Sequence, residues 1–404
     1  MMPHGYMGHF PHQYGIVLIL EIIYFLCGEG NYIVFAYFNA LCVPILVYAG
    51  YRILEEIFAN DILEIYYFLL MLVCGPLYLY VTYIYGEVSS VAFAMVLVWQ
   101  TLRFCRTGSR RSAVFMVLAG AFACVLRMNS MVVLIAVSIV LLLHGMKKCK
   151  EQVVVVILSM FLAVSGATAG IRILYEARSG VEIVDGMPSA CWMLMGFEDS
   201  KYGPGWFNST NYNVYTENDY DVAATTADCM EQIKGRFQEF AADKGVAFDF
   251  FKRKILTQWN SPDYNGFDAV ESFTCEFEEL PTITQNVFKG NFRSLLDTFF
   301  DRYQFWIYFG AAVFMLSALF GKNPDKKDGN KMISIEGHIL LISVVGGVLL
   351  SLIWEAKSRY MFPYMIFLIP LGAAGLYMVL EWCTVLLKLG KRKKDAAERN
   401  RKAA

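Results

Sequence analysis

Apolar residues gather in long runs that are almost free of charge, and short charged segments separate these runs. A helix needs roughly 20 mainly apolar residues to cross the hydrocarbon core of a bilayer. The pattern therefore predicts an all-α polytopic membrane protein with about nine transmembrane helices. The predicted spans are 31–54, 62–84, 87–104, 112–127, 130–145, 152–174, 303–320, 333–353 and 360–387.

Two parts of this pattern are irregular. The runs 112–127 and 130–145 are short, so we expect a tight helical hairpin that turns at Arg127–Asn129. An earlier run, 15–27, has only 13 residues and contains Glu21. That run is too short to span a bilayer, and it predicts an interfacial or re-entrant helix.

Lys and Arg residues fall mainly in a few of the loops. Four segments, 105–111, 146–151, 321–331 and 388–404, hold 18 of the 35 basic residues. The positive-inside rule assigns such segments to the cytoplasm. Strict alternation across nine spans puts all four on that side. We therefore expect a plasma-membrane protein with an external N-terminus and a cytoplasmic C-terminus.

The same alternation predicts the domain organisation. The 128-residue segment 175–302 is long enough for a small extracytoplasmic domain. Helical spacing of apolar residues over 221–259 predicts two or three helices there. The tail is expected to be a solvated extension without fixed structure. The full division is an external loop with a short helix (1–30), a six-helix membrane region (31–174), the extracytoplasmic domain (175–302), a three-helix membrane region (303–387) and a basic cytoplasmic tail (388–404).

Composition supports a membrane protein and excludes several other classes. The chain is 57% hydrophobic with a net charge of −1 and a mean hydropathy of +0.44, so we expect no nucleic-acid partner. Its ten cysteines form no C-x-x-C pair, which argues against a zinc site or a disulfide scaffold. Cys191, Cys229 and Cys275 share one polar region, where one disulfide could form. Phosphate-binding P-loops and G-x-S-x-G elbows are missing from the sequence.

Two polar groups lie at the predicted external ends of spans. Glu87 follows Tyr85 and Gly86, and its carboxylate could bind a metal ion or position a phosphate-bearing ligand. Arg127 and Asn129 lie at the tip of the predicted hairpin. An arginine at membrane depth is costly unless it reaches the interface or an anion, and it binds phosphate with two parallel hydrogen bonds. Ordinary interfacial anchoring is the alternative for each group.

A third polar group opens the last span. Residues 354–360 combine acidic, basic and aromatic side chains, and the positive-inside rule disfavours such a cluster outside. Two further short motifs are candidates. His12 in Pro11–Tyr14 could donate to a phosphate or a sugar hydroxyl, with an interfacial turn as the alternative. Trp259 in Trp259–Pro262 could stack on a sugar ring, with a buried core tryptophan as the alternative. The candidate substrate-binding residues are His12, Gln13, Tyr85, Arg127, Asn129, Trp259, Asn260, Glu355, Lys357, Arg359 and Tyr360.

Several of these segments together resemble a family. They are similar to membrane glycosyltransferases of the C-type (GT-C) fold, most closely to the bacterial relatives of the protein O-mannosyltransferases. The resemblance covers most of the chain, and its last segment is the most specific. The matching segments, in order, are YMGHFPHQYGIVLILEIIYFLCG, YIYGEVSS, VLRMNSMVVLIA, FFKRKILTQWNSPDY and GGVLLSLIWEAKSRYMFPYMIFLIP.

The resemblance implies a reaction. A sugar, a hexose such as mannose, would pass with inversion from a polyprenyl-phosphate carrier in the lipid to an acceptor on the external face. Glu87 would be the catalytic carboxylate that helps to hold the phosphate, with or without a divalent cation such as Mg²⁺ or Mn²⁺. Arg127, Lys357 and Arg359 would offset the phosphate charge.

The start of the chain departs from the family pattern. Members carry a first transmembrane helix and a catalytic Asp before the region that matches Pro11–Gln13, and this sequence begins inside that region. The expectation is a misplaced start site or a truncated, inactive transferase. A transporter or lipid flippase is the alternative from another class, and it would carry ionisable residues near the bilayer midplane or two inverted repeats.

Overall fold

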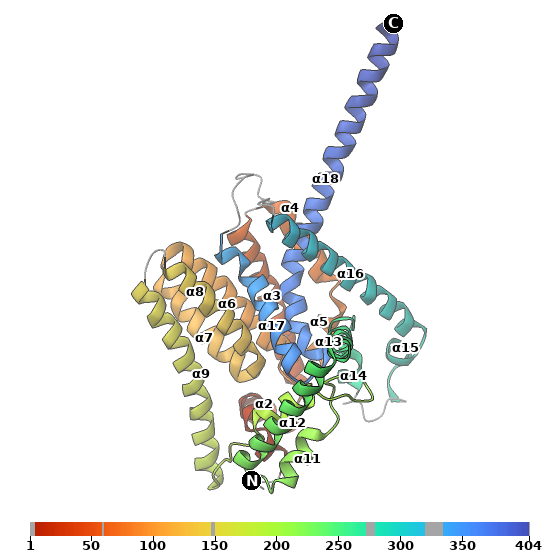
Figure 1. Ribbon diagram of the computed structural model, residues 1–404. Helices are drawn as coiled ribbons and strands as arrows, with labels where there is room; N and C mark the ends of the chain where they lie inside the picture. The colour runs from red at the N-terminus through yellow and green to blue at the C-terminus, as the bar shows by residue number, and fades with distance from the viewer. Residues whose placement is uncertain (1–4, 59, 147–149, 272–278, 320–333, 404) are drawn as a thin grey trace.

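The computed structural model describes residues 5–58, 60–146, 150–271, 279–319 and 334–403, and this part of the chain is helical without any β-strand (Figure 1). Six of its helical segments are long and apolar enough to cross a membrane. The chain is therefore an all-α, multi-pass membrane protein. The six segments are α3 (Ile33–Ile57), α6 (Glu87–Thr107), η2–α8 (Met128–Gly145), α9 (Lys150–Ser179), η4–α17 (Glu336–Ile353) and the part of η5–α18 that covers Ser358–Lys388.

Three of the nine predicted spans have other forms. The run 62–84 becomes α4 (Asp61–Leu72) and α5 (Gly75–Val81), bent by 53° at the break. Pro76 explains this break, since proline has no N–H and fits the first turn of a new helix. The hairpin arm α7 (Arg110–Leu126) has only 17 residues. The run 303–320 belongs to the longer α16 (Asn291–Leu319), so the nine-span count stays a prediction.

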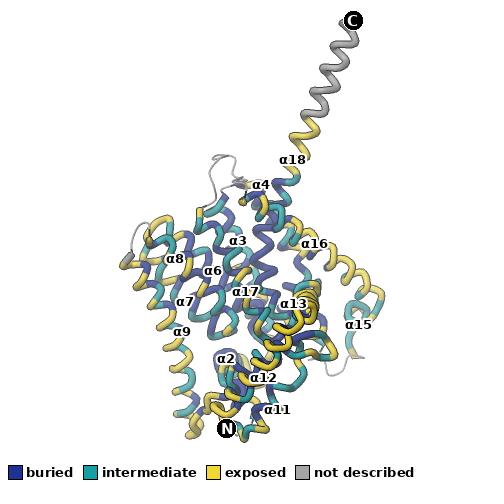
Figure 2. Tube along the Cα trace, in the orientation of Figure 1, coloured by how far each residue is buried: buried dark blue, intermediate teal, exposed yellow. Residues whose placement is uncertain are grey.

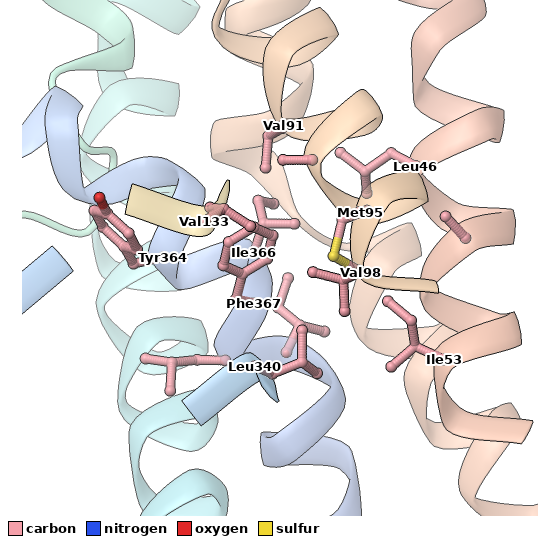
Figure 3. Close-up of a cluster of buried hydrophobic side chains, with 14 of the residues drawn as sticks. Leu46, Ile53, Val91, Met95, Val98, Val133, Leu340, Tyr364, Ile366 and Phe367 are labelled. Atoms are coloured by element: carbon pink, nitrogen blue, oxygen red, sulfur yellow. The ribbon is translucent and has the colours of Figure 1, made fainter. Parts of the chain in front are cut away.

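Helices α6 and α18 form the centre of the bundle, and α9 lies on its outside (Figure 2). The apolar stretch of α18 is 78% buried, whereas that of α9 is 17% buried. Figure 3 shows the core where these helices meet. The buried side chains there are Leu46 and Ile53 of α3, Val91, Met95 and Val98 of α6, Val133 of α8, Leu340 of α17, and Tyr364, Ile366 and Phe367 of α18.

Helices α16 and α18 approach each other most closely through glycines. A Cβ at Gly375 would lie 1.8 Å from the carbonyl oxygen of Gly310, and one at Gly310 would lie 2.4 Å from that of Gly372. Small residues allow such backbone contact between membrane helices. These glycines therefore set the distance between the last span and α16.

We expect Gly375→Val to destabilise the protein by about 1–3 kcal/mol, because two backbones would have to separate. Gly166→Val in α9 is the matched control, since nothing lies within 4 Å of a Cβ at Gly166. Thermal unfolding in detergent, followed by tryptophan fluorescence, measures both variants. Equal unfolding temperatures would contradict the close packing of α16 and α18.

The two or three helices predicted over 221–259 are present as α12 and α13, and the polar segment between α9 and α16 holds further short helices outside that range. Asp221 and Asp243 cap the starts of α12 and α13, each accepting hydrogen bonds from backbone N–H groups of the first turn. A separate core of buried side chains, which includes Phe197, Ile233 and Phe250, supports this segment. Its helices are α10 (Ser189–Gly196), α11 (Thr210–Glu217), α12 (Val222–Ala242), α13 (Lys244–Trp259), α14 (Gly266–Glu271) and α15 (Thr282–Lys289).

Both predicted ends of the chain can be compared with the structure. The short apolar helix is present as α2 (Tyr14–Cys27), preceded by α1 (Tyr6–His9) and the turn η1 (Pro11–Gln13). The prediction of an unstructured tail is wrong, because α18 continues without a break to Ala403. Its run of Lys, Arg, Glu and Ala residues has a high intrinsic preference for a helix.

Cys191 of α10 and Cys229 of α12 meet in the core of the polar segment. The Cys229 thiol donates a hydrogen bond to the Sγ of Cys191 at 3.7 Å, and both residues are buried. Cys275, the third member of the predicted group, lies outside the described residues. Cys191 and Cys229 are free thiols in the structure, and they lie close enough to be one of the predicted pairings.

We expect a mild thiol oxidant to join Cys191 and Cys229, because a small movement brings the sulfurs to bonding distance. The number of maleimide-reactive thiols in the denatured protein should fall by two and recover on reduction. Cys42→Ser, in a membrane helix, should leave this change intact, while Cys229→Ser should abolish it. A full thiol count after oxidation would refute the pairing.

Candidate functional site

The bundle has two ends, with the N-terminus and α11–α13 at one of them and the C-terminal part of α18 leaving from the other (Figure 1). We call the first the loop end, defined by residues 83–86, 127–130 and 354–361, and the second the tail end. Glu87 starts α6 at the loop end, directly after Gly86. Gly86 has a φ of +91°, and a Cβ there would lie 3.2 Å from the carbonyl oxygen of Leu126. Glycine is therefore required for this turn.

Two arginines from distant parts of the sequence lie against Glu87. Its Oε1 is 3.3 Å from Nη1 of Arg127, at the turn between α7 and α8. The same oxygen is 3.5 Å from Nε of Arg359, in the 3₁₀ turn η5 (Ser358–Met361). The Glu87 residue is only 2% exposed. The predicted convergence of these three residues is thus present in the structure.

This ionic cluster is incompletely satisfied. Within the described part of the chain, neither Glu87 oxygen nor the Nε of Arg359 has a hydrogen-bond partner. Two guanidiniums against one carboxylate also leave one positive charge without compensation. Buried polar atoms normally find partners, so unsatisfied ones beside a cavity indicate a ligand site. The excess charge favours an anion over a metal cation at this position.

Tyrosine rings fill the space between the two arginines. The Arg127 guanidinium carbon lies 4.7 Å from the ring centre of Tyr85, and that of Arg359 lies 5.1 Å from the same ring. Tyr360 is within 5.8 Å of Arg127 and 5.6 Å of Arg359. Arg359 also donates a hydrogen bond to the hydroxyl of Tyr83. Cation–π contacts of this kind fix the planes of both guanidiniums.

Two cavities that share lining residues lie beside the cluster. The inner cavity encloses about 20 Å³ and is bounded by Glu87, Arg359 and apolar side chains of α6, α8 and α18. The outer cavity encloses about 340 Å³ and is lined by polar and aromatic side chains of η1, α10 and the loop end. The residues that line both are Arg127, Asn129 and Tyr360.

Aromatic and polar side chains form the wall of the outer cavity. Trp192 and Trp354 stack with ring centres 6.1 Å apart and an angle of 4°. His12 meets Trp192 edge-on at 6.2 Å, and Gln13 accepts a hydrogen bond from the Tyr6 hydroxyl at 3.1 Å. Burial lowers the pKa of His12, and the charge of Arg127 lowers it further.

Glu355 and Lys357 lie behind Tyr360 rather than in the cavity wall. Lys357 Nζ is 3.0 Å from Glu355 Oε1, and the Tyr360 hydroxyl donates to Glu355 Oε2 at 2.8 Å. The Lys357 ammonium also lies 5.0 Å from the ring centre of Phe207. This pair fixes the hydroxyl of Tyr360, so its effect on a ligand is indirect.

Trp259 and Asn260 are not brought to the site. Trp259 packs against Tyr308 and Tyr364, with both ring centres at 6.4 Å, and it lines neither cavity. Asn260 caps the end of α13 and is exposed. The structure thus packs Trp259 against Tyr308 and Tyr364, outside both cavities.

Sequence reasoning missed several residues of the site. Tyr83 lies in the same short motif as Tyr85, and its position two residues earlier could have drawn attention to it. Trp192 and Asp185 lie in no recognised sequence motif. They line the outer cavity only because of how the segment after α9 folds.

Helix α13 holds the loop that carries Arg359. Lys254 is fully buried, and its side-chain nitrogen donates to the carbonyl oxygens of Gly196 and Leu352, the latter at 3.0 Å. Gln258 donates to Ser351 O at 3.2 Å, and the N–H of Ala356 donates to Gly205 O at 2.7 Å. These hydrogen bonds join residues 351–356 to the polar segment. Residues 351–356 directly precede the turn that carries Arg359.

Burial lowers the pKa of Lys254 to about 7. The unfolded chain keeps this proton up to about pH 10.4, so the folded state binds fewer protons between these values. Stability should therefore rise as pH increases from about 7 to about 10. Lys254→Met should remove this part of the pH dependence of thermal unfolding.

Lys252→Met is the control, because Lys252 is exposed on the same helix. Unfolding temperatures measured from pH 6 to 10 should have the wild-type slope in this variant. If Lys254→Met also keeps that slope, Lys254 does not titrate in this range.

No protein-family model, no curated protein and no solved structure matches the chain. The function proposed for the protein therefore rests on the geometry of its site.

Proposed function

We propose that the chain is an integral membrane glycosyltransferase. It moves a sugar, a hexose such as mannose, from a polyprenyl-phosphate carrier to an acceptor hydroxyl with inversion. The observation that carries this proposal is the buried cluster of Glu87, Arg127 and Arg359 beside two cavities. The resemblance of the ordered sequence segments to GT-C transferases supports the same reading.

The ionic cluster suits a phosphate that leaves with the electron pair of the glycosidic bond. Negative charge grows on the bridging oxygen as the bond breaks, and two fixed guanidiniums stabilise that charge. Arg127 and Arg359 bring them from separate helices, and Glu87 orients both. The positive end of α6 points to the same place, because Glu87 is its first residue.

The outer cavity suits the sugar. The stacked pair Trp192 and Trp354 offers apolar ring faces, and His12, Gln13 and Asn129 offer hydrogen-bonding groups on the same wall. Ligand sites commonly combine such an apolar surface with a few directed polar groups. A hexose beside the inner cavity would thus lie between its phosphate and the acceptor.

A divalent cation is not required by this arrangement. Arg127 and Arg359 already supply the positive charge that Mg²⁺ or Mn²⁺ would bring to the phosphate. We therefore assign charge stabilisation to the guanidiniums.

The distribution of basic residues supports an extracytoplasmic loop end. Because Glu87 starts α6 at the loop end, the turn after α6, with Arg110 and Arg111, lies at the tail end, from which the basic part of α18 also leaves. By the positive-inside rule we assign the tail end to the cytoplasm. The polyprenyl phosphate would then bind from the outer leaflet.

A flippase for lipid phosphates is the competing function. Such a protein would need ionisable groups along a path through the membrane. The buried Glu87 and Arg359 lie at the loop end, and the ion pair of His144 with Glu336, at 2.7 Å, lies at the opposite ends of α8 and α17. The inner cavity lies at the loop end together with the ionic cluster, which favours a site at one face of the membrane over a path through it.

The full chain, purified in detergent, should transfer radiolabelled sugar from polyprenyl phosphate to an acceptor in an extract of cell-envelope hydroxyl compounds. Arg359→Gln should lower the rate by about 10²–10³-fold, because a buried charge-stabilising donor is lost. Glu87→Gln should lower it similarly, since both arginines lose the carboxylate that orients them.

Arg178→Gln is the matched control, because Arg178 pairs with Glu21 and is half-exposed. It should keep the wild-type rate. Unchanged transfer in Glu87→Gln would remove the site assignment. Movement of labelled lipid across vesicles without any transfer would support the flippase instead.

A further inference from the structure

A third cavity joins the outer cavity from the side of the membrane helices. It encloses about 190 Å³ between α2, α7 and α9, and its walls are mainly apolar. We call it the groove. The residues that line both the groove and the outer cavity are Pro11, His12, Met128 and Asp185. A hydroxyl that approaches along the groove therefore meets the proposed sugar position beside these side chains.

Asp185 is held firmly although it lies in the extended segment between α9 and α10. Its Oδ1 is 2.9 Å from Nη1 of Arg172, and the Nη2 of that arginine donates to the carbonyl oxygen of Ile183. The N–H of Ile183 donates to Oε1 of Glu176 at 3.0 Å. Three hydrogen bonds to α9 thus fix the backbone and the side chain beside the groove.

The residue after Asp185 ties the segment to the N-terminal turn. Gly186 has a φ of +74°, and a Cβ there would lie 2.4 Å from the Pro11 ring and 2.8 Å from the His9 carbonyl oxygen. The N–H of Met187 donates to that same oxygen at 3.1 Å. This close packing fixes the backbone beside Asp185, and Asp185 and His12 line the same two cavities.

Glu87 and Glu355, the other carboxylates near the cavities, are buried. Glu87 lies between two guanidiniums, and Glu355 accepts from Tyr360 and pairs with Lys357. The Asp185 side chain is 78% exposed and lines two cavities. Of the carboxylates named here, it is the one that an incoming hydroxyl can reach.

We propose that Asp185 is the general base that takes the proton of the acceptor hydroxyl; this rests on the proposed transferase function. As the proton passes to an Asp185 oxygen, the acceptor oxygen forms a bond to the anomeric carbon. The bond from that carbon to the phosphate oxygen breaks, and polyprenyl phosphate leaves with the electron pair. The leaving charge develops beside Arg127 and Arg359, on the opposite side of the sugar.

His12 is the alternative base, because its imidazole lines the same two cavities. Its ring packs edge-on against Trp192, which suits a hydrogen bond to a sugar hydroxyl. We therefore assign His12 to binding and Asp185 to proton transfer.

The test compares binding with turnover in the purified full chain. Asp185→Asn should lower kcat for sugar transfer by about 10²–10⁴-fold, the range for loss of a general base. The Kd for labelled polyprenyl-phosphate sugar should change less than threefold. Asp185→Glu should restore part of the rate, and Glu182→Gln, an exposed acid on the same segment, should keep the wild-type rate.

Each other outcome has a defined meaning. If Asp185→Asn retains wild-type kcat, the base assignment is overturned while the transferase proposal stands. If only His12→Asn lowers kcat at unchanged donor Kd, the base is His12. Loss of donor binding in Asp185→Asn would also overturn the proposal, since it would show a structural role. Absence of transfer in the wild-type chain counts against the transferase function itself.

Discussion

The buried contact of Glu87 with Arg127 and Arg359 joins the start of α6, the turn between α7 and α8, and the start of α18. Removing these charges from water costs several kcal/mol for each ion, and one carboxylate offsets only part of that cost. The cluster therefore retains a net attraction for an anion. The positions of three membrane helices and the chemistry of the site depend on the same three side chains.

The polar segment after α9 stabilises this arrangement from outside the helix bundle. Lys254 and Gln258 of α13 bind the carbonyl oxygens of residues 351 and 352, just before the cluster. The stacked Trp192 and Trp354 join α10 to the same loop. The polar segment thus contributes to the site in two ways. It forms one wall of the outer cavity, and it fixes the backbone that carries Arg359.

The sequence predicted the membrane helices well, because an uncharged apolar run has few alternatives to a buried or lipid-facing helix. It also predicted that Glu87, Arg127 and Arg359 share one end, since alternation of spans determines which loops can meet. The bend at Pro76 and the helical tail were missed, because both depend on local backbone preferences. Asp185 and Trp192 could not be predicted, since contacts formed across more than a hundred residues place them in the site.

Helix α9 has a consequence for the surroundings in which the protein works. With 30 residues it is about 45 Å long, which exceeds the hydrocarbon thickness of a bilayer. Its last turns, which carry Arg172 and Glu176, therefore rise above the apolar layer, while most of its apolar stretch faces outward. The thickness of the surrounding bilayer then helps to determine the height at which α9 presents Arg172 to Asp185. The surrounding lipids therefore influence the geometry of the site.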